Sequence, residues 1–148
     1  MPKIDDHIIQ RIIDAGAAQP AVHTICRRSA FRLNTEAEVD YGVFAYEQGT
    51  HRTEGDNMRY TFRLLYIDRL DEDGSNAEQV QSVGLAVLEN TLSVLREGGL
   101  SIGEATYTPF NDRFVDESAV MMATVEITTP KQYLCEESYD NEKSVKRI

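Results

Sequence analysis

Hydrophobic residues follow two different periods along this chain, and each period predicts a different kind of element. Near the N-terminus, apolar residues recur at helical spacing: Ile8, Ile9, Ile12 and Ile13. They predict a short amphipathic helix over residues 4–18. A longer helical pattern covers residues 76–97; Ser75 and Glu78 before it have the spacing of a capping box, and Gly98 and Gly99 follow it. The pattern therefore predicts a second, longer helix.

Between Met58 and Leu70 the period changes to two. One predicted face is apolar: Met58, Tyr60, Phe62, Leu64 and Tyr66. The other begins with Arg59, Thr61 and Arg63, and this alternation is typical of a strand. Its expected partner is a strand over 39–47, reached through a polar loop over 48–57. Because such a strand spans about 43 Å and a domain of this size is only about 38 Å across, the resulting hairpin is expected to bend or to project.

Three further strands are expected. The segment 22–33 is rich in β-branched and aromatic residues and predicts a bent strand, and 102–110 predicts another. The last strand, 118–129, follows a turn over 111–117 and should point four residues inward: Met121, Ala123, Val125 and Ile127. The element order α-β-β-β-α-β-β predicts an α+β two-layer sandwich with a mostly antiparallel sheet, and it does not suggest a nucleotide-binding parallel sheet.

The chain has 148 residues, enough for one domain, which we place over 1–130. Residues 131–148 are mostly charged and polar, so we expect a disordered tail. With 15 Lys and Arg against 25 Asp and Glu, the net charge of −10 argues against nucleic-acid binding. The chain has no apolar stretch near the roughly 20 residues that cross a bilayer, and its start does not resemble a signal peptide. We therefore expect a cytoplasmic protein with no membrane partner.

The sequence predicts no catalytic, cofactor or metal site. His23 and Cys26 are the only closely spaced soft ligands, and on a strand they would point to opposite faces. The acidic loop 68–76 faintly resembles an EF-hand start, but Gly74 stands at the fourth position, where an EF-hand needs it at the sixth. Whether this loop binds a cation is left open. No nucleophile motif is present, so we expect a protein that is not an enzyme.

Basic residues gather on one predicted strand face and in the hairpin loop. The simplest interpretation is the solvent face of an antiparallel sheet. The functional alternative is a charged contact with an acidic neighbouring subunit, because the rest of the molecule is acidic. Leu65 and Ile67 lie farther along the same face, where a helix or another subunit should cover them. The interface hypothesis therefore contains six residues: His51, Arg52, Arg59, Arg63, Leu65 and Ile67.

Two segments carry a resemblance to a known family. They are Tyr60-Thr-Phe-Arg-Leu-Leu-Tyr-Ile-Asp-Arg-Leu with the following Asp71-Glu-Asp-Gly-Ser-Asn and helix, and Thr108-Pro-Phe-Asn-Asp-Arg-Phe with the strand ending at Thr129-Pro130. Over residues 4–130 the chain resembles the tail terminator, or tail-completion, proteins of long-tailed bacteriophages and prophages.

The resemblance implies a structural protein that forms a ring at the head-proximal end of the tail tube. Its partners would be further copies of itself, the tail tube protein and a head-completion or connector protein, in the bacterial cytoplasm during assembly and then in the virion tail. It implies no catalytic residue. Two alternatives stay open: a head–tail connector or other minor tail component, and a small-molecule-binding or enzymatic domain with a pocket between helix and sheet.

Overall fold

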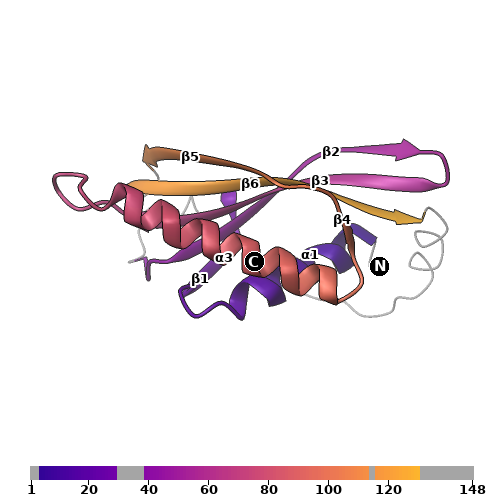
Figure 1. Ribbon diagram of the computed structural model, residues 1–148, viewed down its shortest axis with the longest axis horizontal. Helices are drawn as coiled ribbons and strands as arrows, with labels where there is room; N and C mark the ends of the chain where they lie inside the picture. The colour runs from indigo at the N-terminus through magenta and orange to yellow at the C-terminus, as the bar shows by residue number, and fades with distance from the viewer. Residues whose placement is uncertain (1–3, 30–38, 114–115, 131–148) are drawn as a thin grey trace.

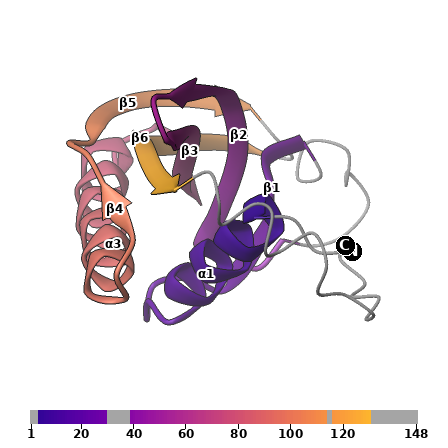
Figure 2. The same cartoon turned by 90° about the vertical axis from the view of Figure 1, so that its right-hand side faces the viewer.

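The computed structural model describes residues 4–29, 39–113 and 116–130, which form a sheet with helices on one face (Figures 1 and 2). The elements in chain order are α1 (Ile4–Ala17), β1 (Thr24–Arg27), β2 (Val43–Glu54), β3 (Asn57–Arg69), α3 (Ala77–Glu97), β4 (Ser101–Ile102), β5 (Thr106–Arg113) and β6 (Glu117–Pro130). The α+β class with a mostly antiparallel sheet is confirmed.

The sheet has six strands, with β3 and β6 at its centre. β1 pairs in parallel with the first part of β2, whereas β2–β3 and β3–β6 are antiparallel. β4 and β5 both pair antiparallel with β6, so they form one interrupted edge on the far side of the sheet from β1. Because β3 is paired along its whole length with β6, the register of the central strands is strongly determined.

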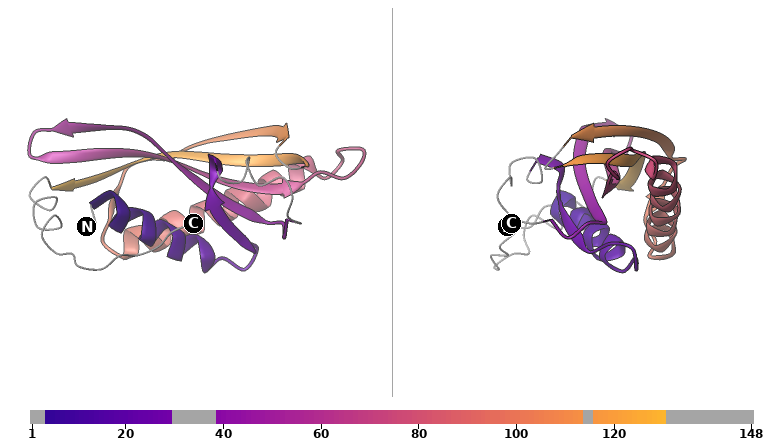
Figure 3. Two further views of the ribbon diagram at one scale, coloured as in Figure 1. Left: turned by 180° about the vertical axis from the view of Figure 1, so that it is seen from behind. Right: turned by 90° about the vertical axis from the view of Figure 1, so that its left-hand side faces the viewer.

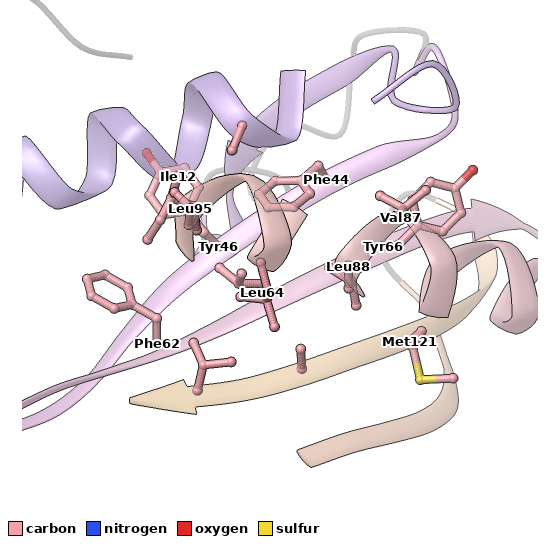
Figure 4. Close-up of a cluster of buried hydrophobic side chains, with 14 of the residues drawn as sticks. Ile12, Phe44, Tyr46, Phe62, Leu64, Tyr66, Val87, Leu88, Leu95 and Met121 are labelled. Carbon is pink, nitrogen blue, oxygen red and sulfur yellow. The ribbon is translucent and has the colours of Figure 1, made fainter. Parts of the chain in front are cut away.

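The main hydrophobic core fills the space between the helices and the sheet (Figure 4). The apolar stripe of α1 is buried, and α3 contributes Leu88, Leu92 and Leu95. The sheet meets them with alternate residues of β3, among them Phe62 and Leu64, and with the four residues of β6 that the sequence predicted to point inward. Both helices, and the inward face of β6, are therefore confirmed.

The loop predicted between the hairpin strands is wrong. β2 continues to Glu54, β3 begins at Asn57, and only Gly55 and Asp56 form the turn. Polar composition indicated a loop, but a strand that is exposed on both faces can be polar throughout. The tip of the hairpin extends past the ends of both helices in two opposite views (Figures 1 and 3).

The start of β2 also differs from the prediction. The strand begins at Val43 and not at residue 39, because the chain passes very close to another segment at Gly42. A Cβ atom at Gly42 would overlap the carbonyl oxygen of Ala21. This bend fits only glycine without a shift of the backbone.

Three other boundaries need correction. The strand expected over 22–33 is confined to β1, since Arg28 and Ser29 are helical, and residues 30–33 lie outside the described residues. The strand expected over 102–110 is divided into β4 and β5 around residues 103–105, and β5 continues to Arg113 into the expected turn. Edge strands pair on one side only, so local irregularities interrupt them more easily than central strands.

The capping box predicted from Ser75 and Glu78 is also wrong. The N-cap of α3 is Asn76, and its side chain makes no capping bond to the helix. Asn76 instead joins the ends of the acidic loop: its Oδ1 accepts from the backbone N–H of Asp71 at 2.8 Å, and its Nδ2 donates to the carbonyl oxygen of Arg69 at 3.0 Å. The loop that leads into α3 is therefore closed by one amide side chain.

A second, smaller cluster lies on the face of the sheet opposite the helices. Its buried members are Val43, Ala45, Leu65, Ile67 and Val120. Cys26, Tyr41, Phe110 and Met122 pack around them and are partly buried. Burial raises the pKa of the Cys26 thiol to about 11, which keeps it protonated near neutral pH. The outer face is thus apolar at the end of the sheet remote from the hairpin tip.

Candidate functional site

The hairpin of β2 and β3 carries all six residues of the interface hypothesis. Its register pairs Glu47 with Arg63 and Arg52 with Arg59. Residues 52–57 at its tip are all exposed. Figure 3 shows that the two strands twist strongly as they leave the body of the molecule.

A bulge in β2 decides where His51 points. Three steps along β2, from Gln48 to His51, match two steps along β3, from Phe62 to Tyr60. The extra residue turns His51 to the helix-facing side, where its ring stands edge-on to that of Tyr60 with centroids 4.8 Å apart. Its Nε2 lies 2.8 Å from Oε1 of Gln48. His51 therefore does not join the arginines, although both were expected in one group.

Arg52 and Arg59 form a compact ion-pair cluster with two glutamates on the outer face. Arg59 contacts Glu54 at 2.7 Å and Glu126 at 3.2 Å. Arg52 contacts Glu126 at 3.0 Å and Glu54 at 3.8 Å. The bond and charge of Glu54 raise the pKa of the Arg59 guanidinium further. Each cation thus bridges β2 and β6 across β3, which stiffens the outer half of the hairpin.

Arg63 belongs to a second ion-pair group nearer the body. Its guanidinium lies 3.5 Å from Glu47, and Arg28 reaches the same carboxylate oxygen at 3.1 Å. These side chains are between one-fifth and two-fifths exposed. With two arginines on one glutamate, this group keeps a positive charge that is available to an acidic partner.

Leu65 and Ile67 are fully buried in the second cluster. The helix expected to cover them is not there, because α1 and α3 pack on the other face of the sheet, and Tyr41, Phe110 and Met122 are among the residues that pack around them instead. A direct contact of either side chain with another chain would require the surrounding cluster to open. They therefore differ from Arg52 and Arg63, which are reachable from solvent.

The outer edge of β2 is open at the hairpin. β1 pairs only with Val43–Tyr46, and no described strand pairs with the same edge over residues 47–54. The opposite edge of the sheet, at β5, also has no further partner within the described residues. An open edge of this kind presents backbone N–H and C=O groups that another strand can pair with.

Sequence reasoning missed the glutamates that neutralise the arginine stripe. Glu126 is far from the hairpin in sequence, and only the β3–β6 register places it opposite Thr61 and beside the two arginines. Glu54 was assigned to a loop. Alternation within β6 could have placed Glu126 on the outer face. Its neighbours Arg52 and Arg59 could not be identified without the register of the strands.

Candidate chemistry elsewhere is sparse in the parts of the chain that the structure describes. They contain no group of three or more His, Cys, Asp or Glu residues arranged to hold a metal ion. In the acidic loop, Oδ1 of Asp73 accepts from the backbone N–H of Ser75 at 3.0 Å, and hydrogen bonding there lowers the pKa of Asp73. Cys135 lies outside the described residues. No described helix is long and apolar enough to cross a membrane.

Comparison with known proteins gives no family for this chain. No protein-family model matches it, and a search of the curated proteins found no match.

Proposed function

We propose that this protein is a structural subunit of a phage or prophage tail, which forms a ring that ends the tail tube and joins it to the head. The observation that carries the proposal is the open outer edge of β2 on a hairpin that extends past the helices. In the proposed ring, the helices and the sheet form the two layers of the subunit body, and the hairpin is a projecting arm. The resemblance over residues 4–130 supplies the biological setting.

The placement of the two open edges supports a ring. The two open edges, at β2 and at β5, lie on opposite sides of the same sheet. A contact between unlike surfaces repeats head to tail, and it closes into a ring when the rotation between subunits permits. Edge pairing between β2 of one copy and β5 of the next would be such a contact.

The space between helix and sheet favours assembly over catalysis. Large apolar side chains from α1, α3 and the sheet fill it (Figure 4). An enzymatic or ligand-binding domain with its site at this position would need a cavity with polar groups there. A head–tail connector would use the same edges, so only the partners distinguish it from a terminator.

The role in tail assembly is tested by electron microscopy of particles from a host that lacks this gene but keeps the other tail genes. We expect abnormally long tails, or tails without heads. Long tails identify a terminator, whereas tails of normal length without heads identify a connector. Normal infectious particles would rule out both roles.

The edge contact is tested separately with Thr53→Pro. Glu54 and Asn57 close the two-residue turn, so the next pair, Thr53 and Met58, is not hydrogen-bonded, and the N–H group of Thr53 faces the outer edge. A proline at this position blocks the edge without removing a hydrogen bond to β3. We expect native mass spectrometry to show loss of the ring, with an unchanged circular dichroism spectrum. Thr53→Val keeps the N–H group and should assemble as the wild type does. Rings of equal stability in both variants would contradict edge pairing.

A further inference from the structure

A pocket of about 260 Å³ lies where the end of β6 meets α1 and the turn after α3. It is separate from the hairpin edges. α1 contributes His7 and Arg11, and Thr129 of β6 brings a hydroxyl group. No Asp or Glu among the described residues lines it, although the chain has 25 acidic residues against 15 Lys and Arg. The described lining is therefore basic, and its side chains are hydrogen-bond donors, within an acidic protein.

Thr129 supplies an independent reason to expect a ligand. The residue is only 7% exposed, and its Oγ1 is buried without a hydrogen-bond partner in the described structure. A buried hydroxyl without a partner costs about 1–3 kcal/mol, so native proteins rarely keep one without cause. A ligand oxygen in the pocket would accept from this hydroxyl.

Arg11 is held in place at the pocket. Its Nη2 donates to the carbonyl oxygen of Gly98 at 2.6 Å, at the C-terminal end of α3. A guanidinium has five N–H groups, and that carbonyl uses one of them. Within the described part of the chain Arg11 makes no other hydrogen bond, so its remaining donors are available to an anion.

The surroundings select the kind of anion. The carbonyl end of α3 carries partial negative charge, which disfavours a dianion such as phosphate beside Arg11. Ile8, Leu100 and Pro130 give the pocket an apolar side, and its volume lies below the range of about 300–1,000 Å³ that is usual for drug-sized ligands. From this arrangement we infer that the pocket binds the carboxylate form of a small aliphatic acid. Its carboxylate group would lie at Arg11 and Thr129, and its hydrocarbon part would pack against Ile8 and Leu100.

The test is a titration of the full-length ¹⁵N-labelled protein with isovalerate, followed through the amide signals of Ser101 and Thr129. Isovaleramide is the neutral control of equal shape, and inorganic phosphate is the dianion control, all at constant ionic strength. We expect saturable shifts with isovalerate and binding at least about tenfold weaker with the other two, because one charge-assisted hydrogen bond is worth about a factor of ten or more. Equal binding of the amide, stronger binding of phosphate, or no saturable shift would overturn the assignment.

Two variants test the residues. Arg11→Gln should weaken isovalerate binding about tenfold, whereas Arg113→Gln, far along the sheet at an exposed ion pair with Glu117, should leave it unchanged. Thr129→Val removes the hydroxyl that has no partner, so it should raise the melting temperature of the ligand-free protein and still weaken isovalerate binding. Wild-type affinity in either pocket variant would overturn the inference, and Thr129→Val keeps the test valid if Arg11→Gln does not fold.

Discussion

Gly84 sets the distance between α3 and the sheet. A Cβ atom at this position would lie 2.8 Å from Cβ of Met121 and 3.2 Å from Cβ of Tyr66. Real Cβ atoms do not approach so closely, and both neighbours are held by paired strands at the centre of the sheet. The glycine therefore allows the helix to pack directly on β3 and β6, at a small cost in helix propensity.

The first prediction is that Gly84→Ala destabilises the protein. Alanine would favour the helix by about 1 kcal/mol, but overpacking of a filled core costs about 1–3 kcal/mol. We expect a lower free energy of unfolding in urea. Ser82→Ala on the exposed side of the same helix is the control and should change stability by less than about 0.5 kcal/mol. A more stable Gly84→Ala protein would show that the helix moves away from the sheet without penalty.

Three tyrosines, at positions 41, 66 and 107, link stability to alkaline pH. Burial raises the pKa of each from 10.0 to about 12, and nearby carboxylates add to the effect. The Tyr41 hydroxyl donates to Oδ2 of Asp116 at 2.7 Å. A phenol with a higher pKa in the folded state keeps its proton longer there. Its stabilising effect is therefore complete below pH 10 and disappears as the pH rises toward 12.

The second prediction concerns Tyr41→Phe. The variant should be about 1 kcal/mol less stable at pH 7, because it loses the hydrogen bond to Asp116. Between pH 10 and 12 its stability should fall less steeply than that of the wild type, since one of the three linked phenols is gone. Urea unfolding at a series of pH values measures both effects. An identical slope would mean that Tyr41 does not contribute to the alkaline transition.

At the scale of elements, the β2–β3 hairpin combines a tight turn, a bulge and ion pairs. Gly55 has φ of +60°, and it is the first of the two turn residues. Glycine at that place is typical of a type II′ turn, whose twist matches that of paired strands. The bulge then turns the side chains of the outer part of β2 to the opposite faces of the sheet, which places Arg52 beside Glu126. A polar segment thereby becomes a long and ordered arm.

The third prediction is that Gly55→Ala destabilises the hairpin by about 1 kcal/mol, because an L-residue at positive φ is strained. Nothing lies within 4 Å of the added Cβ, so crowding does not contribute. Asp56→Ala, at the other turn residue, is the matched control and should have a smaller effect. Hydrogen exchange of the amides of β2 and β3 near the tip measures the difference. Equal protection in both variants would argue against a strained turn.

At the scale of the whole molecule, the two faces of the sheet have different uses. The helices bury one face completely along its centre. The other face is apolar at one end, around Leu65 and Ile67, and charged toward the hairpin tip, where the arginine clusters lie. The chain carries a net charge of −10, so in the proposed ring the excess positive charge of the Arg63 and Arg28 group would face an acidic surface of the next copy.

The fourth prediction is that Arg63→Glu weakens assembly but leaves the subunit folded. Arg63 is partly exposed and Arg28 still neutralises Glu47, so the variant should retain its circular dichroism spectrum. Native mass spectrometry should show fewer rings, and raised salt should weaken the wild-type rings in the same direction. Arg96→Glu, at an exposed position in the last turn of α3 and on neither open edge, is the charge-matched control. Unchanged assembly of Arg63→Glu would remove Arg63 from the interface.

The sequence by itself determined the strongly periodic parts of this protein. Both helices, the facing of β3 and the inward residues of β6 could be predicted, because burial on one side imposes a period that is visible in the residues. The α+β class followed from the order of those elements. The boundaries of the edge strands could not be predicted, since pairing on one side imposes no clear pattern.

Only the tertiary structure decided how the hairpin is built and what surrounds its charges. The segment 48–57 has the composition of a loop, but it forms strand because it pairs with β3, with one bulge, up to a two-residue turn. Glu126 reaches Arg52 and Arg59 through the register of β3 and β6, which joins residues far apart in the chain. The unpartnered hydroxyl of Thr129 is likewise a property of packing. Periodicity reports which side of an element is buried, whereas the neighbours of a side chain depend on how separate elements meet.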